Sequence, residues 1–265
     1  MTDPLPGGAD ASPAASVHED GGMQNPVPVT AVTGGSRGIG AAVVRRLAAE
    51  GHHVIIGYRD DADAAARVAA EVRALGREAV TAAVDVTDPQ SLDAFLGEAQ
   101  NLGQLTGVVA AAGAVRGVGR LLDLDPADLK EDLEVNLLGA VLTSRAAVHH
   151  LARAGGSLVL IGSAAATLGS PGSYVHYAAA KAGVAALSLG LSKEVAADGI
   201  RVNCVEPGTV WTDFHQDPDR PAKVASSIPL GRAGMPDEIA GAVTWLLSSD
   251  AAYTTGATLR VAGGL

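Results

Sequence analysis

Residues 29–47 read VTAVTGGSRGIGAAVVRRL, an apolar run that leads through spaced glycines into a helical pattern. The run VTAV predicts a β-strand, and Ile39, Val43 and Leu47 recur at the spacing of a helix that Gly51 would end. Apolar runs and helical stretches continue to alternate along the chain. The expected strands are 28–34, 53–59, 78–86, 106–113, 157–163, 200–208 and 257–264, and the expected helices are 38–51, 61–76, 88–103, 126–154, 177–197 and 236–249.

This alternation is typical of a parallel sheet that is covered by helices on both faces. Right-handed crossovers make such a sheet doubly wound, so we predict an α/β protein with a Rossmann-type doubly wound parallel sheet. Residues 27–265 would form a single domain, because no segment is left over for a second one. Residues 1–26 are rich in Pro, Gly, Ala, Ser and Asp, and we expect them to be a disordered tail.

The composition excludes several classes of function. The chain has 265 residues, of which 48% are hydrophobic and 3% aromatic, so aliphatic side chains and alanine must fill the core. A formal net charge of −10 and the lack of a basic run argue against nucleic acid as a partner. A single cysteine, Cys204, excludes an intrachain disulfide and a cysteine-cluster metal site, and we expect a buried thiol. No apolar run is long enough to span a bilayer, and a cytoplasmic location is expected.

The turn TGGSRGIG, residues 33–40, predicts a phosphate-binding site. Glycines between a strand and a helix let the backbone approach a pyrophosphate, whose charge the helix N-terminus favours. The spacing is G-x-x-x-G-x-G, from Gly34 through Gly38 to Gly40. Glycine-rich turns are common in proteins. This one lies at the first crossover, between a strand and a helix, and that position favours a phosphate-binding role.

The second strand ends in GYRDD, which bears on the choice of dinucleotide. An acidic residue here would hold a free ribose 2′-hydroxyl, whereas Arg59, together with Arg37, suits a 2′-phosphate. We place Asp60 and Asp61 at the start of the next helix, as capping residues. NADP(H) is therefore favoured over NAD(H). Asp85, after the third strand, is placed either to accept a hydrogen bond from adenine or to cap a turn or helix.

A set of short motifs, in this order along the chain, resembles the short-chain dehydrogenase/reductase family, including its 3-oxoacyl-carrier-protein-reductase-like and sugar-dehydrogenase-like members. The resemblance covers the chain from about Val27 to its end. The motifs are TGGSRGIG, DVTD at 85–88, AAAG at 110–113, Val135–Asn136, Ile161–Ser163, Tyr177-AAA-Lys181 and Pro207-Gly208-TVW-Thr212.

The resemblance implies an NADP(H)-dependent oxidoreductase that transfers hydride reversibly between the cofactor and a carbonyl or alcohol, as a carbonyl reductase or alcohol dehydrogenase does. Tyr177 would be the general acid or base, and Lys181, one helical turn on, would lower the pKa of its phenol. Ser163 would orient the carbonyl, and Asn136 would hold a water that links Lys181 to solvent. A buried asparagine with a purely structural role is the alternative. The cofactor would contact Gly34, Ser36, Arg37, Gly38, Ile39, Gly40, Arg59, Asp85, Val86, Ala112, Gly113, Asn136, Tyr177, Lys181, Pro207, Gly208, Val210 and Thr212, with no metal.

The sequence departs from the family pattern in two places that concern the site. The usual Asn-Asn-Ala-Gly segment is Ala110-Ala111-Ala112-Gly113 here. Ser163 lies 14 residues before Tyr177, whereas 13 is usual. We expect the loop GSPGS, residues 169–173, to absorb the extra residue without moving the serine or the helix.

The polar, proline-rich segment 212–238 would close over the cofactor as a lid. Trp211, Phe214, His215, Thr167 and Leu168 are candidates for the pocket wall. Arg116, Arg120 and Arg153 could contact a carrier-bound thioester, although solvated surface charges are the simpler interpretation.

The stretch GSPGSYVHYAAAK, residues 169–181, offers two further candidates for chemistry. Tyr174 lies two turns from Lys181, so we expect it to shape the pocket mouth or to pack. His176 points about 100° away from Tyr177 on a helix, so it is not the expected base and is interpreted as part of the loop or the pocket edge.

Two other functions stay open, a 3-oxoacyl-thioester reductase and a non-catalytic NADP-binding regulatory protein. The resemblance also implies a homotetramer formed through the helices that carry Asn136 and Tyr177 and through the last strand.

Overall fold

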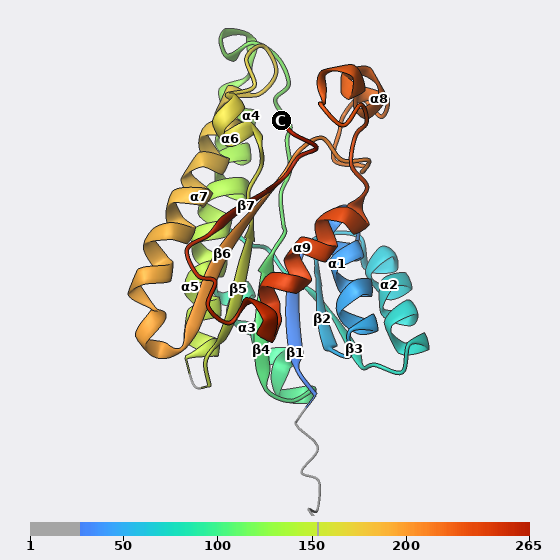
Figure 1. Ribbon diagram of the computed structural model, residues 1–265, viewed down its shortest axis with the longest axis vertical. Helices are drawn as coiled ribbons and strands as arrows, with labels where there is room; N and C mark the ends of the chain where they lie inside the picture. Colours follow the sequence, from blue (N-terminus) through green and yellow to red (C-terminus); the bar gives the residue numbers. More distant parts are fainter. Residues whose placement is uncertain (1–26, 153) are drawn as a thin grey trace, which may run out of the picture.

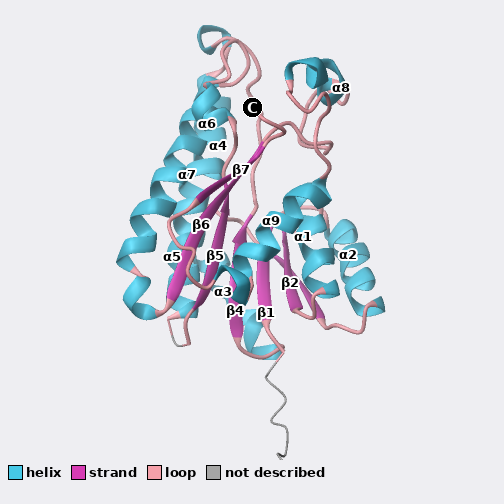
Figure 2. Ribbon diagram, in the orientation of Figure 1, coloured by secondary structure: helices cyan, strands magenta, loops and turns pink. Residues whose placement is uncertain are grey.

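A seven-stranded, fully parallel sheet forms the middle layer of the protein in a computed structural model that describes residues 27–152 and 154–265 (Figures 1 and 2). The expected tail, residues 1–26, and Arg153 lie outside the described residues. The strands follow the order β3-β2-β1-β4-β5-β6-β7. They are β1 (Val29–Thr33), β2 (His53–Tyr58), β3 (Ala79–Ala83), β4 (Leu105–Ala110), β5 (Gly156–Ile161), β6 (Ile200–Pro207) and β7 (Thr258–Val261).

Helices connect consecutive strands and cover both faces of the sheet. The α-helices are α1 (Gly38–Ala49), α2 (Ala62–Ala74), α3 (Pro89–Gly97), α4 (Pro126–Leu133), α5 (Gly139–Leu151), α6 (Ala165–Leu168), α7 (Val175–Glu194), α8 (Arg220–Val224) and α9 (Pro236–Leu247). Short 3₁₀ turns are η1 (Glu98–Asn101), η2 (Leu121–Asp123), η4 (Ala196–Asp198), η5 (Ala225–Ser227) and η6 (Ser249–Ala251), and η3 (Glu134–Leu138) is a π turn. The predicted Rossmann-type doubly wound sheet is confirmed.

The two faces of the sheet bury two separate cores, because successive side chains of a strand point to opposite sides. Val32 packs with α1, α2 and α9, whereas its neighbour Ala31 packs with α3, α5 and α7. Figure 1 shows these two helix layers on either side of the strands. Cys204 belongs to the second core and is fully buried, as the sequence predicts.

Strand order reverses beside β1, which has β2 on one side and β4 on the other. The crossovers from β1 and β4 therefore leave in opposite directions and open a crevice beyond the carboxyl ends of these strands. The glycine turn after β1 and the AAAG segment after β4 both lie at this crevice, so the ligand-binding site is expected there.

The single helix expected at 126–154 is not continuous. It consists of α4, the π turn η3 and α5, and the π turn contains Asn136. A π turn inserts an extra residue into the helical repeat, so side chains before and after it do not share one stripe. Leu133 is accordingly 38% exposed, whereas Asn136 is buried. Leu133 and Asn136 therefore lie on different faces, although an unbroken helix would place both on one stripe.

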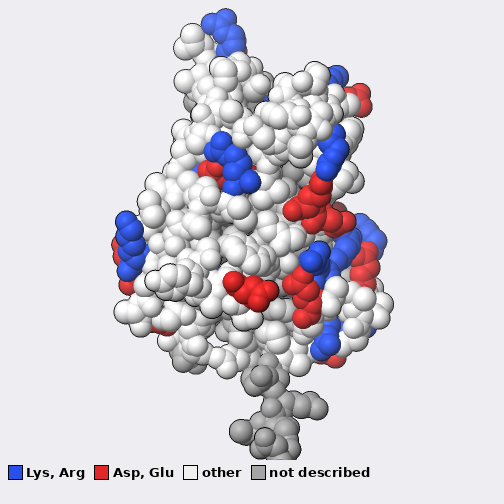
Figure 3. All heavy atoms as spheres, in the orientation of Figure 1, with Lys and Arg blue, Asp and Glu red and all other residues white. Residues whose placement is uncertain are grey.

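The surface shown in Figure 3 carries basic and acidic side chains in small mixed groups, with no continuous basic patch on that face. Several are ion pairs, such as Arg232 with Glu238 at 2.6 Å. Within residues 27–152 and 154–265, no helix combines the length and hydropathy of a membrane span.

The close approach of Gly40 to the Gly34 carbonyl can be tested by a substitution. A Cβ on this residue would lie 2.1 Å from the Gly34 carbonyl oxygen, so the turn and α1 would have to separate. We expect Gly40→Ala to lower the free energy of unfolding by about 1–3 kcal/mol. The control is Gly241→Ala in α9, where an added Cβ would have no atom within 4 Å. This variant should raise the free energy of unfolding by up to about 1 kcal/mol. Urea unfolding of both variants measures the difference, and an unchanged stability of Gly40→Ala would contradict the contact.

Candidate active site

A cavity of about 650 Å³ lies beyond the carboxyl ends of the strands. It is lined by every residue that the sequence analysis assigned to the cofactor or to catalysis, except Asn136. The sheet topology brings these residues together from seven separate segments of the chain. The arrangement suits an elongated ligand, with a glycine turn at one end and Tyr177 at the other.

The glycine turn has the backbone geometry that a phosphate site needs. Gly34 and Gly38 have φ angles of +65° and +54°, which residues with a side chain rarely adopt. Helix α1 begins at Gly38, and neither a side-chain cap nor an acidic residue occupies its first turn. Its first N–H groups can therefore meet an anion in the cavity, as the dipole of the helix favours.

Two arginines border the expected sugar end of the cavity. Arg37 is exposed, and Arg59 is half-exposed and only loosely paired, at 3.6 Å from Asp60 and 3.8 Å from Glu131. Asp61 accepts a hydrogen bond of 2.8 Å from the Ala64 N–H and caps α2, as predicted. Both guanidinium groups thus keep donors for a phosphate.

Asp85 makes a local turn at the cavity wall. Its Oδ1 accepts hydrogen bonds from the backbone N–H and the hydroxyl of Thr87, at 2.9 and 2.7 Å. These bonds hold the pKa of the carboxyl below its usual range. The turn role that the sequence left open is present, and its lining position leaves Oδ2 for a ligand.

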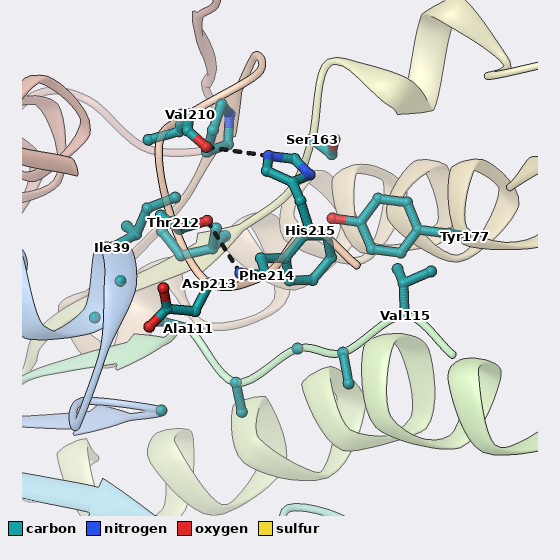
Figure 4. Close-up of a pocket in the computed structure, with 18 of the residues that line it drawn as sticks. Ile39, Ala111, Val115, Ser163, Tyr177, Val210, Thr212, Asp213, Phe214 and His215 are labelled. Atoms are coloured by element: carbon teal, nitrogen blue, oxygen red, sulfur yellow. Dashed lines mark hydrogen bonds between the residues drawn. The ribbon is translucent and has the colours of Figure 1, made fainter. Parts of the chain in front are cut away.

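Tyr177, Lys181 and Ser163 meet at the other end of the cavity. Ser163 follows β5, and Tyr177 and Lys181 lie one turn apart on α7, where both side chains are buried. The Lys181 ammonium donates to the Ile161 carbonyl at 2.8 Å and lies 5.6 Å from the centre of the Tyr177 ring. Figure 4 shows the Tyr177 hydroxyl pointing toward Ser163 and His215.

Burial shifts the pKa values of Tyr177 and Lys181 in opposite directions. It raises the pKa of Tyr177, against a smaller lowering by the hydrogen bond with Ser163. It also lowers the pKa of Lys181 to about 8. The expected lowering of the Tyr177 pKa by Lys181 is not found, because the ammonium bonds the Ile161 carbonyl and burial outweighs its charge. Tyr177 keeps its proton at neutral pH and can donate it.

Asn136 lies behind this group and does not line the cavity. Its Nδ2 donates to the carbonyls of Ala114 and Asp132, at 2.5 and 2.8 Å. Its buried Oδ1 has no partner among the described residues. A Cβ placed on Gly113 would lie 3.0 Å from that oxygen and 3.9 Å from the Lys181 ammonium, so both groups lie next to Gly113. The amide is held in place with a free acceptor near the lysine, which suits the expected bridging water.

The lid contributes aromatic side chains to the cavity. The ring centres of Phe214 and Tyr177 lie 5.7 Å apart, and His215 donates through Nε2 to the Val210 carbonyl at 3.1 Å (Figure 4). Burial lowers the pKa of His215. Leu168 also lines the cavity, whereas Trp211 and Thr167 do not. The lid is fastened by Gln216, which donates to the Arg116 carbonyl at 2.6 Å.

His176 is not part of the loop or of the pocket edge. Its Nε2 lies 2.8 Å from the Asp132 carboxylate, and both side chains are almost fully buried. Asp132 also accepts the N–H groups of Arg116 and Gly117 at 2.8 and 3.1 Å. This pair joins the segment after β4 to α7, next to Tyr177. The sequence analysis missed Asp132, whose surroundings give no local signal.

The two departures from the family pattern leave the site intact. The Thr33 hydroxyl accepts the N–H groups of Ala111 and Ala112, at 3.2 and 3.3 Å, and so orders the AAAG segment. The loop before α7 absorbs its extra residue with left-handed conformations at Gly169, Ser170 and Gly172, and Ser163 still bonds Tyr177. Of the three arginines considered for a carrier-bound substrate, Arg116 lines the cavity and Arg120 does not.

The lowered pKa of Lys181 predicts a pH dependence of stability. Between pH 8 and its ordinary value of 10.5, the unfolded chain holds a proton that the folded chain has lost, so stability rises with pH. Cys204, whose pKa is raised from 9.0 to about 11, offsets this gain above pH 9, because there the folded chain holds a proton that the unfolded chain has lost. We expect a gain of about 1 kcal/mol between pH 8 and 9. Urea unfolding should show this gain in the parent protein and lose it in Lys181→Met, and equal slopes would contradict it.

Comparison with known proteins identifies relatives over nearly the whole described chain. A family model described as enoyl-(acyl carrier protein) reductase matches residues 34–265. An uncharacterized oxidoreductase of Escherichia coli, YgfF, is 39% identical over 244 residues, which cover 89% of this chain and 99% of that protein. The 3-oxoacyl-[acyl-carrier-protein] reductase FabG of Escherichia coli is 36% identical over 241 residues, covering 89% and 96%.

A solved structure shares both the fold and the sequence pattern. The short-chain dehydrogenase of Burkholderia cenocepacia in complex with NADP superimposes with a TM-score of 0.83. It is 35% identical, and the match covers 89% of this chain and 96% of that one. Fold, site geometry and relatives agree, and the chain belongs to the short-chain dehydrogenase/reductase family of oxidoreductases.

Proposed function

We propose that this protein is an NADP(H)-dependent carbonyl reductase or alcohol dehydrogenase that uses Tyr177 as general acid or base. The observation that carries this proposal is the buried Tyr177 hydroxyl, which points toward Ser163 at one end of a cavity whose other end is an uncapped helix N-terminus (Figure 4). A protein that only binds the cofactor has no need of this serine–tyrosine pair.

Different residues along the cavity would bind different parts of the cofactor. The N-terminus of α1 would hold the pyrophosphate, and Arg37 and Arg59 the 2′-phosphate. Lys181 would hold the hydroxyls of the nicotinamide ribose, and Pro207, Gly208, Val210 and Thr212 would border the nicotinamide. The bound cofactor supplies or accepts a hydride at the substrate carbon.

Ser163 and Tyr177 would bind the substrate oxygen from one side. Ser163 donates a hydrogen bond that orients the carbonyl, and Tyr177 transfers its proton to the oxygen as negative charge develops there. In the reverse direction, Tyr177 takes the proton of the alcohol. Asn136 and Lys181 would replace the proton of Tyr177 from solvent, through a water between Oδ1 and the ammonium.

A 3-oxoacyl-thioester reductase is the second candidate function. The relative FabG, by its name, reduces such substrates attached to a carrier protein, and Arg116 lies at the cavity wall. Arg116 is, however, held by Glu131 at 2.5 Å, which reduces what it can offer a phosphate. Loss of NADPH absorbance with diketones, sugars and acetoacetyl thioesters would separate the two candidates.

A cytoplasmic homotetramer is also part of this proposal. Exposed apolar side chains lie on the two helices expected at the interface, at Leu133, Leu138 and Val141 along α4–α5 and at Leu189 on α7. Such side chains favour burial against a second copy.

Tyr177→Phe removes the proton donor but keeps the ring. We expect turnover to fall by at least about a hundredfold, the usual contribution of a general acid, with NADPH affinity within about twofold of the parent. The control is Tyr253→Phe, at a fully exposed tyrosine, which should change neither. Steady-state turnover and fluorescence titration with NADPH measure both, and a variant that keeps its activity would refute the role of Tyr177.

Arg37→Ala and Arg59→Ala test the preference for NADP(H). Each change removes a charge-assisted hydrogen bond to the 2′-phosphate, so the Kd for NADPH should rise about ten- to a hundredfold. The Kd for NADH should change little. Arg67→Ala, on the exposed side of α2, is the control. Parallel titrations with both dinucleotides measure the effect, and an equal loss for NADH would overturn the assignment.

A further inference from the structure

Arg220, the first residue of the lid helix α8, lines the substrate end of the cavity and has no ion-pair partner among the described residues. The lid carboxylate that acts on it at longer range, Asp217, is paired instead with Lys223 at 2.7 Å. Arg116, which also lines the cavity, is held by Glu131, the carboxylate that lies 3.8 Å from Arg59. Arg220 therefore presents a fixed positive charge that the protein does not neutralise by contact.

The contacts of Arg220 leave most of its donors unused. Its Nη2 donates to the Tyr174 hydroxyl at 3.0 Å, and the guanidinium lies 5.2 Å from the centre of the Tyr174 ring. Its Nε is buried and has no hydrogen-bond partner in the described part of the chain. A buried donor without an acceptor is destabilising, so this position is built for an acceptor that the chain itself does not supply.

The ring of Tyr174 contacts both the Arg220 guanidinium and the ring of Tyr177. The rings of Tyr174 and Tyr177 meet edge to face, with centres 5.4 Å apart, and Arg220 lies against the Tyr174 ring. Val115 and Phe214 pack with the two tyrosines, and the apolar Leu168 and Val224 also line the cavity, together with Ser170 and Ser227. A small substrate that bonds Tyr177 with its oxygen would thus have an apolar middle and a second polar end near Arg220.

The other charges of the cavity do not cancel this cation. The opposite, cofactor end is bordered by the charged residues Arg37, Arg59, Asp60, Asp61 and Asp85. In the view of Figure 4, Asp213 lies on the other side of Phe214 from Tyr177. Lys181 is bound to the Ile161 carbonyl, and His215, whose pKa is lowered first by burial and also by Arg220, is neutral at pH 7. The substrate end is therefore positive.

We propose that Arg220 binds the carboxylate of a small oxo or hydroxy acid whose carbonyl or hydroxyl group lies at Tyr177. A guanidinium offers a carboxylate two parallel hydrogen bonds, and here Tyr174 holds the group in place from the other side. This inference rests on the proposed function, because it names the class of substrate that the same site takes. It selects small carboxylates over neutral ketones, sugars and carrier-bound thioesters.

Binding of a matched pair of probes tests the inference without turnover. Cyclohexanecarboxylate and cyclohexanecarboxamide have the same shape, and titration calorimetry of the protein saturated with NADPH compares them. We expect the parent protein to prefer the carboxylate by about ten- to a hundredfold. Arg220→Gln should abolish the preference, and Arg220→Lys should restore part of it. Ala222→Gln, at an exposed position of the same helix and outside the cavity, is the control for damage to the lid and should keep the preference.

Turnover then separates this inference from the proposed function. The substrates are 4-oxocyclohexanecarboxylate and 4-methylcyclohexanone, with NADPH as cofactor. Carboxylate preference in binding without turnover of either ketone would leave Arg220 as a carboxylate site and remove the proposed reaction. Equal binding of the two probes by the parent protein, or a preference that survives Arg220→Gln, would overturn the inference even if both ketones are reduced. Tighter binding of acetoacetyl-phosphopantetheine than of either probe, lost in Arg220→Gln, would also overturn it.

Discussion

The close approach of Gly40 to the Gly34 carbonyl is the constraint on which the site depends. Only a residue without a side chain lets α1 begin so near the end of β1, and this contact directs the N-terminus of α1 into the crevice between β1 and β4. The same turn fixes the edge against which the segments after β4, β5 and β6 are arranged. Because all strands are parallel, each of those segments leaves the sheet at this one edge and adds its side chains to one cavity.

The features that could be predicted from the sequence are those with a local physical cause. Apolar strands, the glycine turn and the helix stop at Gly51 depend on residues a few positions apart, and a parallel sheet then carries their ends to a common edge. The cavity lining follows from that topology, and for this reason all the assigned residues but Asn136 reach it. The π turn at Glu134–Leu138 has no comparable signal, since the helical pattern on either side of it is normal.

The pair of Asp132 and His176 shows why the remainder could not be predicted. The two residues are 44 positions apart, and each taken alone is an ordinary polar residue of a helix. In the structure the carboxylate is buried, and it is satisfied by two backbone N–H groups and the imidazole. A buried acid with three hydrogen bonds fixes the elements that donate them, so the wall of the cavity after β4 and the helix that carries Tyr177 are held as one unit.

Burial determines how Tyr177 and Lys181 can act, because it opposes charge on both. The phenol keeps its proton, and the ammonium is stabilised by the Ile161 carbonyl and lies near the amide oxygen of Asn136. A protonated phenol beside a serine hydroxyl is a proton donor toward a carbonyl oxygen. Acting as a base requires a buried phenolate, which hydrogen-bond donors and a positive charge held close to it both stabilise. The ammonium is 5.6 Å from the ring centre, so any ligand group that neutralises or shifts it changes the balance between the two directions of the reaction.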